Sequence, residues 1–191
     1  MKKILFYPGT FNPPHFGHVS VVKVAVDTLG FDDVWVMPCG KRLDKVIPTS
    51  YEDRRNLGNL FVEYLQTVVN IPVKMLTNEL DDTEGKYTHE VIMELKSQSV
   101  DEIFQLVGID GFMSIKERVI GPNEKFVISK RSGYKFYEEM ISNSNLIFLD
   151  EAVAGISSTK IREMVKNGDD GYKKLVPGKV ASYIEGKRLY Q

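Results

Sequence analysis

The chain has 191 residues, and we expect residues 1–191 to form a single domain, because this length suits one domain with a substantial core. Lysine and arginine total 25 against 26 aspartate and glutamate residues, so a net charge of −1 gives no general attraction to nucleic acid or to an anionic membrane. A lone cysteine, Cys39, excludes a disulfide within the chain and fits a reducing cytoplasm. Apolar runs are too short for a signal peptide or a membrane span, so we expect a cytoplasmic protein, and the sequence leaves a homo-oligomer open.

Short runs rich in β-branched and aromatic residues alternate with segments of helical periodicity. The predicted strands are residues 4–7, 34–37, 71–75, 103–107, 126–129 and 146–149. The predicted helices are residues 17–29, 51–65, 88–96, 112–118, 136–141 and 158–166. Parallel strands need helix-length connections, so this order predicts an α/β fold with a doubly wound, Rossmann-like parallel sheet, strand order 3-2-1-4-5 and C-terminal helices. An acidic cluster after the third strand, Glu79, Asp81, Asp82 and Glu84, is interpreted as a solvated loop.

The segment GTFNPPHFGH, residues 9–18, follows directly on the first predicted strand. Gly9 and Gly17 let the backbone approach a ligand closely, while His15 and His18 fall on one side of a first helical turn. A helix start presents unpaired N–H groups and the positive end of its dipole to an anion. Two histidines at this spacing also occur by chance on surfaces, but the whole pattern predicts a site for nucleotide phosphates.

Two later segments are expected near this site. Gly108 and Asp110 follow the fourth predicted strand, which neighbours the first one where strand order reverses; a plain helix N-cap explains Asp110 equally well. Residues 155–162, GISSTKIR, open another helix, with Ser157 or Ser158 as the expected N-cap. Cations in a first turn oppose the helix dipole, so Lys160 and Arg162 indicate a bound anion.

These motifs carry a family resemblance. Residues 9–18 resemble the (G/H)xGH-type signature of the nucleotidyltransferase superfamily, and residues 156–162 are similar to the ISSTxIR motif of the enzymes that adenylate pyridine mononucleotides. Residues 86–88, 107–110 and 175–190 match further parts of the same enzymes in the same order. Over nearly its whole length the chain therefore resembles the nicotinate and nicotinamide mononucleotide adenylyltransferases.

The resemblance implies a reaction of NAD biosynthesis in which the 5′-phosphate of the mononucleotide attacks the α-phosphorus of ATP. The products are the dinucleotide, NaAD or NAD, and pyrophosphate. Because the nucleophile is already an anion, catalysis reduces to alignment and charge stabilisation, without a general base. His15, His18 and Arg162 are the catalytic candidates, as contacts to the ATP phosphates. We expect Mg²⁺ to arrive on the triphosphate, since ligands at zinc spacing are missing from the sequence.

The resemblance also implies the residues that surround each substrate. Around ATP we expect Gly9, Thr10, Phe11, Gly17, Gly108, Asp110, Ile156, Ser157, Ser158 and Thr159. Around the mononucleotide we expect Asn12, Lys41, Tyr87, Thr88 and Phe112. The spacing does not decide which of Lys41, Arg42 and Lys45 meets the mononucleotide phosphate, and Arg54 and Arg55 rank below Lys41.

One departure bears on the acceptor. Bacterial nicotinate mononucleotide enzymes usually carry a tryptophan in the helix that follows the GAD-like turn, but residues 112–119 contain none, and Trp35 is interpreted as core. Phe112 or Tyr87 is then the expected partner of the pyridine ring, and Lys116 or Arg118 that of a nicotinate carboxylate. Acid or amide stays open.

Two further functions stay as alternatives. One keeps the chemistry and changes the acceptor, for example to pantetheine phosphate, and the other is a non-catalytic nucleotide-binding regulator. The ISSTKIR segment favours the pyridine mononucleotide, and both histidines together with Arg162 argue against a regulator.

Overall fold

The computed structural model describes residues 1–40, 46–82, 85, 87–98, 101–119, 124–130, 145–150 and 155–191. Its strands are β1 (Lys3–Gly9), β2 (Asp33–Pro38), β3 (Val73–Met75), β4 (Glu102–Gly108), β5 (Lys125–Ser129) and β6 (Leu146–Leu149). Its helices are α1 (Phe16–Leu29), α2 (Tyr51–Val68), α3 (Asn78–Asp81), α4 (Thr88–Gln98), α5 (Ile109–Val119), α7 (Ser158–Lys166), the 3₁₀ helix η1 (Asp170–Lys174) and α8 (Gly178–Gly186). The predicted helix at residues 136–141 lies outside the described residues.

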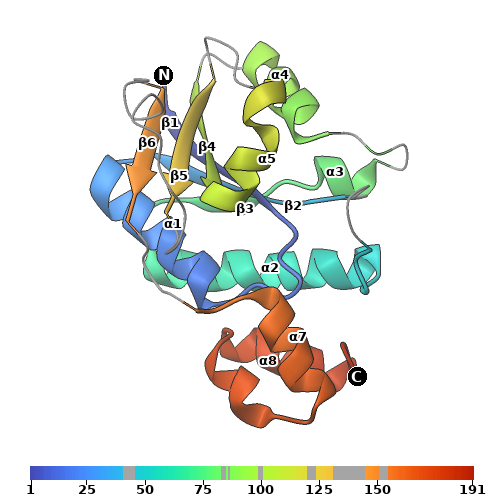
Figure 1. Ribbon diagram of the computed structural model, residues 1–191. Coiled ribbons are helices and arrows are strands. Elements are labelled where there is room, and N and C mark those ends of the chain that lie inside the picture. The colour runs from blue at the N-terminus through green and yellow to red at the C-terminus, as the bar shows by residue number, and fades with distance from the viewer. Residues whose placement is uncertain are drawn as a thin grey trace.

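The six strands form one parallel sheet in the order β3-β2-β1-β4-β5-β6 (Figure 1). The predicted order 3-2-1-4-5 is confirmed, and β6 adds an edge strand beyond it. Strand order reverses between β1 and β4, which pair directly with each other. Segments that follow these two strands therefore meet at the carboxyl edge of the sheet, where doubly wound folds bind ligands.

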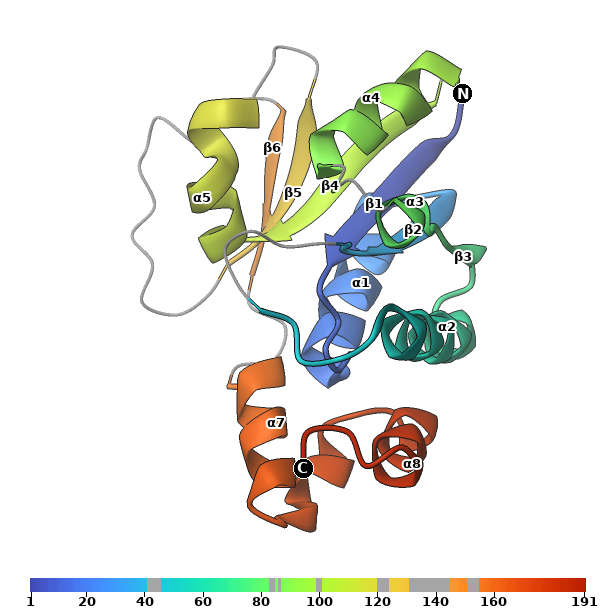
Figure 2. The ribbon, with the colours of Figure 1, turned by 90° about the vertical axis from the view of Figure 1, so that its right-hand side faces the viewer.

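Helices cover both faces of the sheet, with α1 and α2 on one side and α4 and α5 on the other (Figure 2). Successive side chains of a strand point to opposite faces, and β1 follows this rule. Leu5 and Tyr7 enter the core beneath α1 and α2, whereas Ile4 and Phe6 pack toward α4. Trp35 lies in this second core, as expected, and is 7% exposed.

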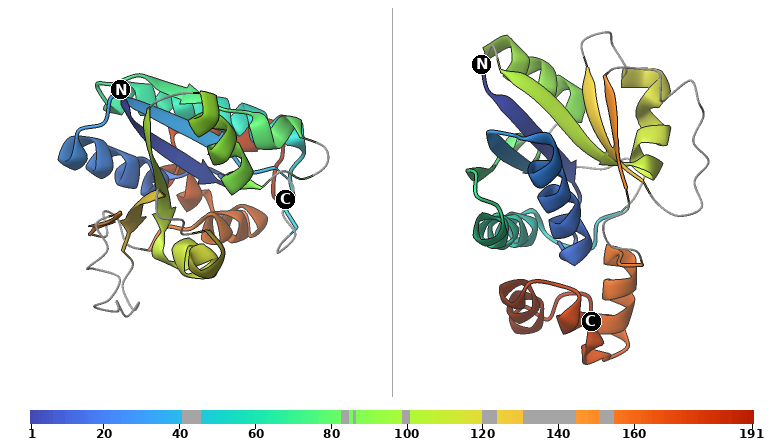
Figure 3. Two further views of the ribbon diagram at one scale, coloured as in Figure 1. Left: turned by 90° about the horizontal axis from the view of Figure 1, so that it is seen from above. Right: turned by 90° about the vertical axis from the view of Figure 1, so that its left-hand side faces the viewer.

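The C-terminal helices α7 and α8, with η1 between them, lie beyond the carboxyl edge of the sheet (Figure 3). Their apolar side chains form a cluster of their own, which Leu57 of α2 completes. Further along the same face, at four-residue intervals, α2 contributes Phe61 and Leu65 to the core of the sheet. Helix α2 thus packs against both parts of the molecule.

Helix ends follow their local signals. Gly30 ends α1 in the left-handed conformation, with φ at 64°, as the sequence predicted. At the start of α2 the Ser50 hydroxyl accepts from the Asp53 backbone N–H at 3.0 Å. None of the described helices is long and apolar enough to cross a membrane.

Candidate active site

The loop from β1 to α1 folds around the ring of Phe11. This side chain is 2% exposed, and its ring lies edge-on to Tyr7 and His18, with 5.1 Å between centroids in each case. A Cβ at Gly9 would come within 2.7 Å of the Phe11 ring, so the turn has room only for glycine there. Phe11 itself has a φ of 45°, in the left-handed region that costs a non-glycine residue energy. Packing of one ring therefore fixes the shape of this loop.

His15 and His18 stack on each other at the start of α1. Their ring centroids are 3.7 Å apart and their planes differ by 21°. The His15 backbone N–H donates to Nδ1 of His18 at 3.2 Å, which assigns the ring hydrogen of neutral His18 to Nε2. A Cβ at Gly17 would lie 3.0 Å from the His15 ring, so glycine leaves the space that this ring occupies. The predicted juxtaposition of the two histidines is confirmed, with His15 buried and His18 partly exposed.

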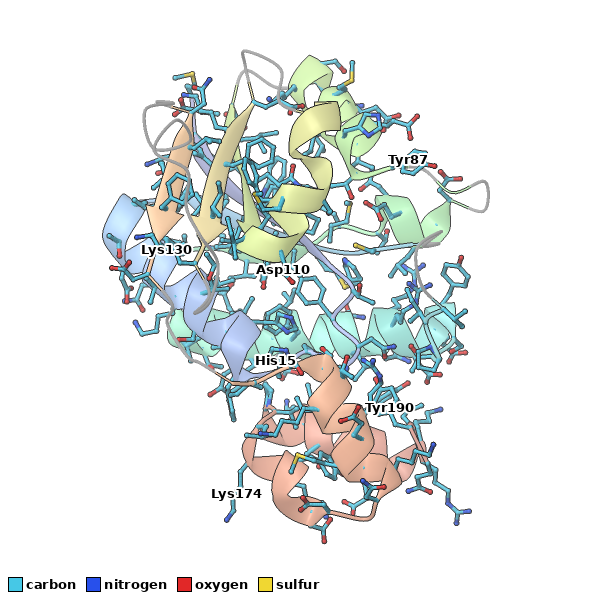
Figure 4. The ribbon with its side chains drawn as sticks, viewed as in Figure 1. His15, Tyr87, Asp110, Lys130, Lys174 and Tyr190 are labelled. Atoms are coloured by element: carbon cyan, nitrogen blue, oxygen red, sulfur yellow. The ribbon has the colours of Figure 1, made fainter. Side chains whose placement is uncertain are left out.

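The end of β4 adds the second predicted segment. Gly108 is its last residue, and α5 starts at once with the buried Ile109. Asp110 is exposed and lies in the first turn of α5, inside the helix rather than at its N-cap. A Cβ at Gly108 would come within 2.8 Å of the Asp110 carboxylate. Figure 4 shows Asp110 and His15 at the edge of the sheet that faces α7.

Helix α7 is bonded directly to the loop after β1. The Ser158 hydroxyl donates to the carbonyl of Pro13 at 2.8 Å, and Nη1 of Arg162 donates to the carbonyl of Asn12 at 2.7 Å. Nη2 of Arg162 also donates to Oγ1 of Thr159 at 3.1 Å. The structure therefore brings the two terminal motifs together, as the sequence predicted, through bonds between protein groups.

The start of α7 is capped as expected. Ser157 is the N-cap, and its hydroxyl accepts from the Lys160 backbone N–H at 3.2 Å. Ile156, one residue earlier, lies beside the first turn of α1: a Cβ added at Gly17 would be 3.7 Å from the Ile156 Cβ. Lys160 is exposed.

Asn12 was expected to contact the mononucleotide, but its side chain is enclosed by the protein. It is 2% exposed, and its Oδ1 accepts from the Thr49 hydroxyl at 3.0 Å and from the hydroxyl of Tyr190. Its backbone carbonyl accepts from Arg162. Asn12 thus connects the loop between β1 and α1 to three other segments of the chain.

Glu79 corrects the interpretation of the acidic cluster as a solvated loop. It belongs to the short helix α3 and is 4% exposed. Its carboxylate accepts from the Gly40 backbone N–H at 3.0 Å and from the Thr88 hydroxyl at 2.6 Å. A carboxylate is buried when hydrogen bonds replace its water, and these two bonds do so. Glu79 links the end of β2 to the start of α4.

Arg54 and Arg55 were low-ranked candidates for a substrate phosphate, and both bond to the protein itself. Arg54 is 4% exposed, and its Nη1 donates to the carbonyls of Cys39 and, at 2.8 Å, of Gly40. Arg55 pairs with Asp81. The sequence did not predict that Arg54 holds the backbone after β2, because no motif connects α2 to that segment.

Some of the candidate contacts to the mononucleotide lie in the described part of the chain and others do not. Lys41, Arg42 and Lys45 lie outside the described residues, as do the side chains of Lys116 and Arg118. Thr88 begins α4, and Tyr87 just before it is 54% exposed, with its ring stacked on His89 at 5.8 Å.

Phe112 was expected to offer its ring to the pyridine, and its burial contradicts this. It is 0% exposed and packs edge-on against Phe126, 5.3 Å between centroids. Helix α5 begins earlier than predicted, so this residue turns toward the sheet. Among the described aromatic residues at this edge, Tyr87 keeps an exposed ring.

Within the described residues, His, Cys, Asp and Glu side chains form no group of three that could hold a metal ion. Apart from the Asp110 carboxylate, the side chains described at this edge contribute N–H donors, hydroxyls and cations. Such groups bind and stabilise anions.

The fold is that of a nucleotidyltransferase, and comparison with known proteins supports this class. A family model described as cytidylyltransferase-like matches residues 6–164. Probable nicotinate-nucleotide adenylyltransferases from Lactiplantibacillus plantarum and Bacillus cytotoxicus are 32% and 30% identical to this chain, each over 100% of its length and over 89% and 100% of their own. The chain belongs to the nicotinate-nucleotide adenylyltransferase family, within the cytidylyltransferase-like group.

Solved structures agree on the fold. The Plasmodium falciparum nicotinic acid mononucleotide adenylyltransferase complexed with NaAD superposes with a TM-score of 0.81, at 20% identity. The superposition covers 100% of this chain and 98% of that one, so the C-terminal helices are included in the shared fold.

Proposed function

We propose that this chain transfers the adenylyl group of ATP to nicotinate mononucleotide, giving NaAD and pyrophosphate. One observation supports this function above the others: Arg162 of α7 bonds the backbone of the loop that leads to the stacked histidines. Donors from the first and the last motif of the chain therefore lie close together at the carboxyl edge of the sheet. The names of the curated relatives favour nicotinate as the pyridine base.

The chemistry requires alignment and charge stabilisation. The phosphate oxygen of the mononucleotide is already a nucleophile, so no residue has to remove a proton. Negative charge grows on the oxygens around the α-phosphorus, where the Nε2–H of His18 and the N-terminus of α1 act as donors. Arg162 stabilises the departing pyrophosphate, because a guanidinium binds phosphate oxygens in pairs.

ATP enters as its Mg²⁺ complex, and the ion is part of the substrate. It neutralises phosphate oxygens and keeps several waters as ligands.

The mononucleotide is proposed to bind near the start of α4, on the side of the β1–α1 loop opposite the ATP phosphates. Thr88 opens α4, and its hydroxyl is oriented by Glu79. Tyr87 is our candidate for the ring that stacks on the pyridine, because more than half of its surface is exposed.

The test is product formation by the purified chain with Mg²⁺, ATP and either nicotinate or nicotinamide mononucleotide. We expect pyrophosphate and NaAD, with the larger kcat/KM for the nicotinate compound. His18→Ala and Arg162→Ala should each lower kcat by about 10², the usual cost of losing a donor to the transition state.

Matched controls come from the same helices. Lys23→Ala removes an exposed cation of α1, and Lys166→Ala removes one from the last turn of α7; both should keep the wild-type kcat. Failure of the folded wild-type protein to form either dinucleotide would refute the function, and unchanged kcat in the His18 and Arg162 variants would refute their roles.

A further inference from the structure

One tyrosine after α8 bonds to the loop between β1 and α1, residues 10–15, which is the phosphate loop of the proposed site. Tyr190 donates its hydroxyl hydrogen to Oδ1 of Asn12, across a sequence separation of 178 residues. Asn12 lies between Phe11, whose ring shapes the loop, and the residues that lead to His15. The C-terminal end thus contacts the backbone turn that positions the histidines.

The tail takes a defined path to reach this position. After α8, Arg188 and Tyr190 adopt φ values of 51° and 68°, in the left-handed region. Such a residue costs about 1 kcal/mol or more unless its surroundings require it. The Leu189 backbone N–H donates to the Ile184 carbonyl at 3.0 Å, and Leu189 packs on the C-terminal apolar cluster. The tail is therefore folded back on α8, with Tyr190 directed at Asn12.

The hydroxyl of Tyr190 is a dependable donor. Burial raises its pKa above the ordinary tyrosine value, and the opposing effect of Arg162 is smaller, so the hydrogen stays in place at neutral pH. Asn12 receives a second donor from Thr49, and its carbonyl receives Arg162. Donors from three segments therefore hold one loop residue.

We propose that Tyr190 is a positioning residue for the adenylyl transfer: through Asn12 it holds the phosphate loop in the shape that presents His15 and His18 to ATP. This inference rests on the proposed function of the loop. Tyr190 does not touch the reacting atoms. Its hydroxyl acts on the loop, and its ring packs with the C-terminal cluster.

A second tyrosine, Tyr183 of α8, serves as a matched control. The Tyr183 hydroxyl donates to Asp53 at 2.9 Å and accepts from Asn56 at 2.9 Å, and both partners belong to α2 rather than to the loop between β1 and α1. Tyr183→Phe and Tyr190→Phe each delete one partly buried, hydrogen-bonded hydroxyl and keep the ring. Their comparison separates an effect on the loop from a general effect on the C-terminal helices.

The experiment measures kcat, KM for ATP and thermal midpoint for both variants, and the affinity for Mg·ATP by calorimetry. We expect Tyr190→Phe to lower kcat/KM for ATP about tenfold, as loss of one positioning hydrogen bond does, and Tyr183→Phe to stay within about twofold of wild type. The two thermal midpoints should fall by similar amounts. Equal kinetics in both variants would overturn the proposal.

A double-mutant cycle tests the route through Asn12. In an Asn12→Ala background, Tyr190→Phe should cause no further loss, whereas an equal loss in both backgrounds would contradict action through Asn12. If Tyr190→Phe does not fold, Thr49→Ala removes the other donor to Oδ1 and should lower kcat/KM in the same direction; unchanged kinetics would then decide against the proposal. Should wild type make no dinucleotide, the proposed function fails, and the Mg·ATP affinities of the two tyrosine variants still decide the role of Tyr190.

Discussion

Gly40 is buried, and its Cα faces the backbone of α3. A Cβ at this position would lie 2.0 Å from the Glu79 carbonyl oxygen, which cannot move without shifting the helix. We predict that Gly40→Ala lowers the free energy of unfolding by about 2 kcal/mol or more, because overpacking against a backbone is not relieved by a rotamer change. Chemical denaturation measures the change. Gly186→Ala, where a Cβ meets nothing within 4 Å, should leave stability unchanged, and equal effects of the two substitutions would refute the argument.

Local signals at the residue scale were sufficient for some of the site. The glycine stop at Gly30 and an N-cap at Ser157 or Ser158 follow from a few neighbouring residues; both are confirmed, with Ser157 as the cap. Glu79 and Tyr190 were missed because their partners are distant, 39 residues away for Gly40 and 178 for Asn12. A single sequence carries no signal for a hydrogen bond at such separations, since only the tertiary fold brings these groups together.

Elements with a clear hydrophobic period were predicted well, and the short helix α3 was not. The six described strands lie within two residues of their predicted ranges, and α7 has the predicted range at both ends. Helix α3 has 4 residues, too few for a helical period to appear, so its acidic residues were interpreted as a loop. Helix α5 starts directly after β4 with no turn residues to mark its first turn, and this early start is why Phe112 points into the core.

The first turn of α2 provides a pH-dependent test at the element scale. The Ser50 hydroxyl, together with that of Tyr183, lowers the pKa of Asp53 below its ordinary value of 3.8, although partial burial opposes the shift. A depressed carboxyl pKa contributes stability above the unfolded pKa and loses it as pH falls through the folded one. We therefore predict that Asp53→Asn lowers the free energy of unfolding by about 1 kcal/mol at neutral pH, reduced by partial solvent exposure.

The measurement is urea denaturation of wild type and Asp53→Asn between neutral pH and pH 3. Their difference should shrink once the pH falls below 3.8, as the Asp53 carboxylate takes up a proton in the folded state. Glu52→Gln removes a charge from the same helical turn at an exposed position and should show a smaller difference. A gap between wild type and Asp53→Asn that stays constant with pH would show that the carboxylate charge is not its cause.

At the scale of the whole molecule, the sequence predicted the sheet and the meeting of the two terminal motifs at its carboxyl edge, but not how the C-terminal helices attach. The order of strands and helices leads to the doubly wound topology because crossover connections leave few alternatives. The attachment depends on the side chains of α2, which enter two apolar clusters at successive positions of one helix face. From the sequence alone, Leu57 and Phe61 read as one stripe facing one core.

This dual packing predicts that the two parts unfold together. Leu57 is 0% exposed and joins α2 to the C-terminal cluster, so Leu57→Ala should lower the free energy of unfolding by about 3 kcal/mol through lost contacts and a residual cavity. In both wild type and variant, the fluorescence of Trp35 in β2 and the hydrogen-exchange protection of α8 should be lost at the same urea concentration. Asn59→Ala, at an exposed position of the same helix, should leave that concentration unchanged. Cooperative unfolding requires that loss of one apolar cluster destabilises the other through α2. Two separate transitions in the wild type would therefore mean that the C-terminal helices are an independent unit.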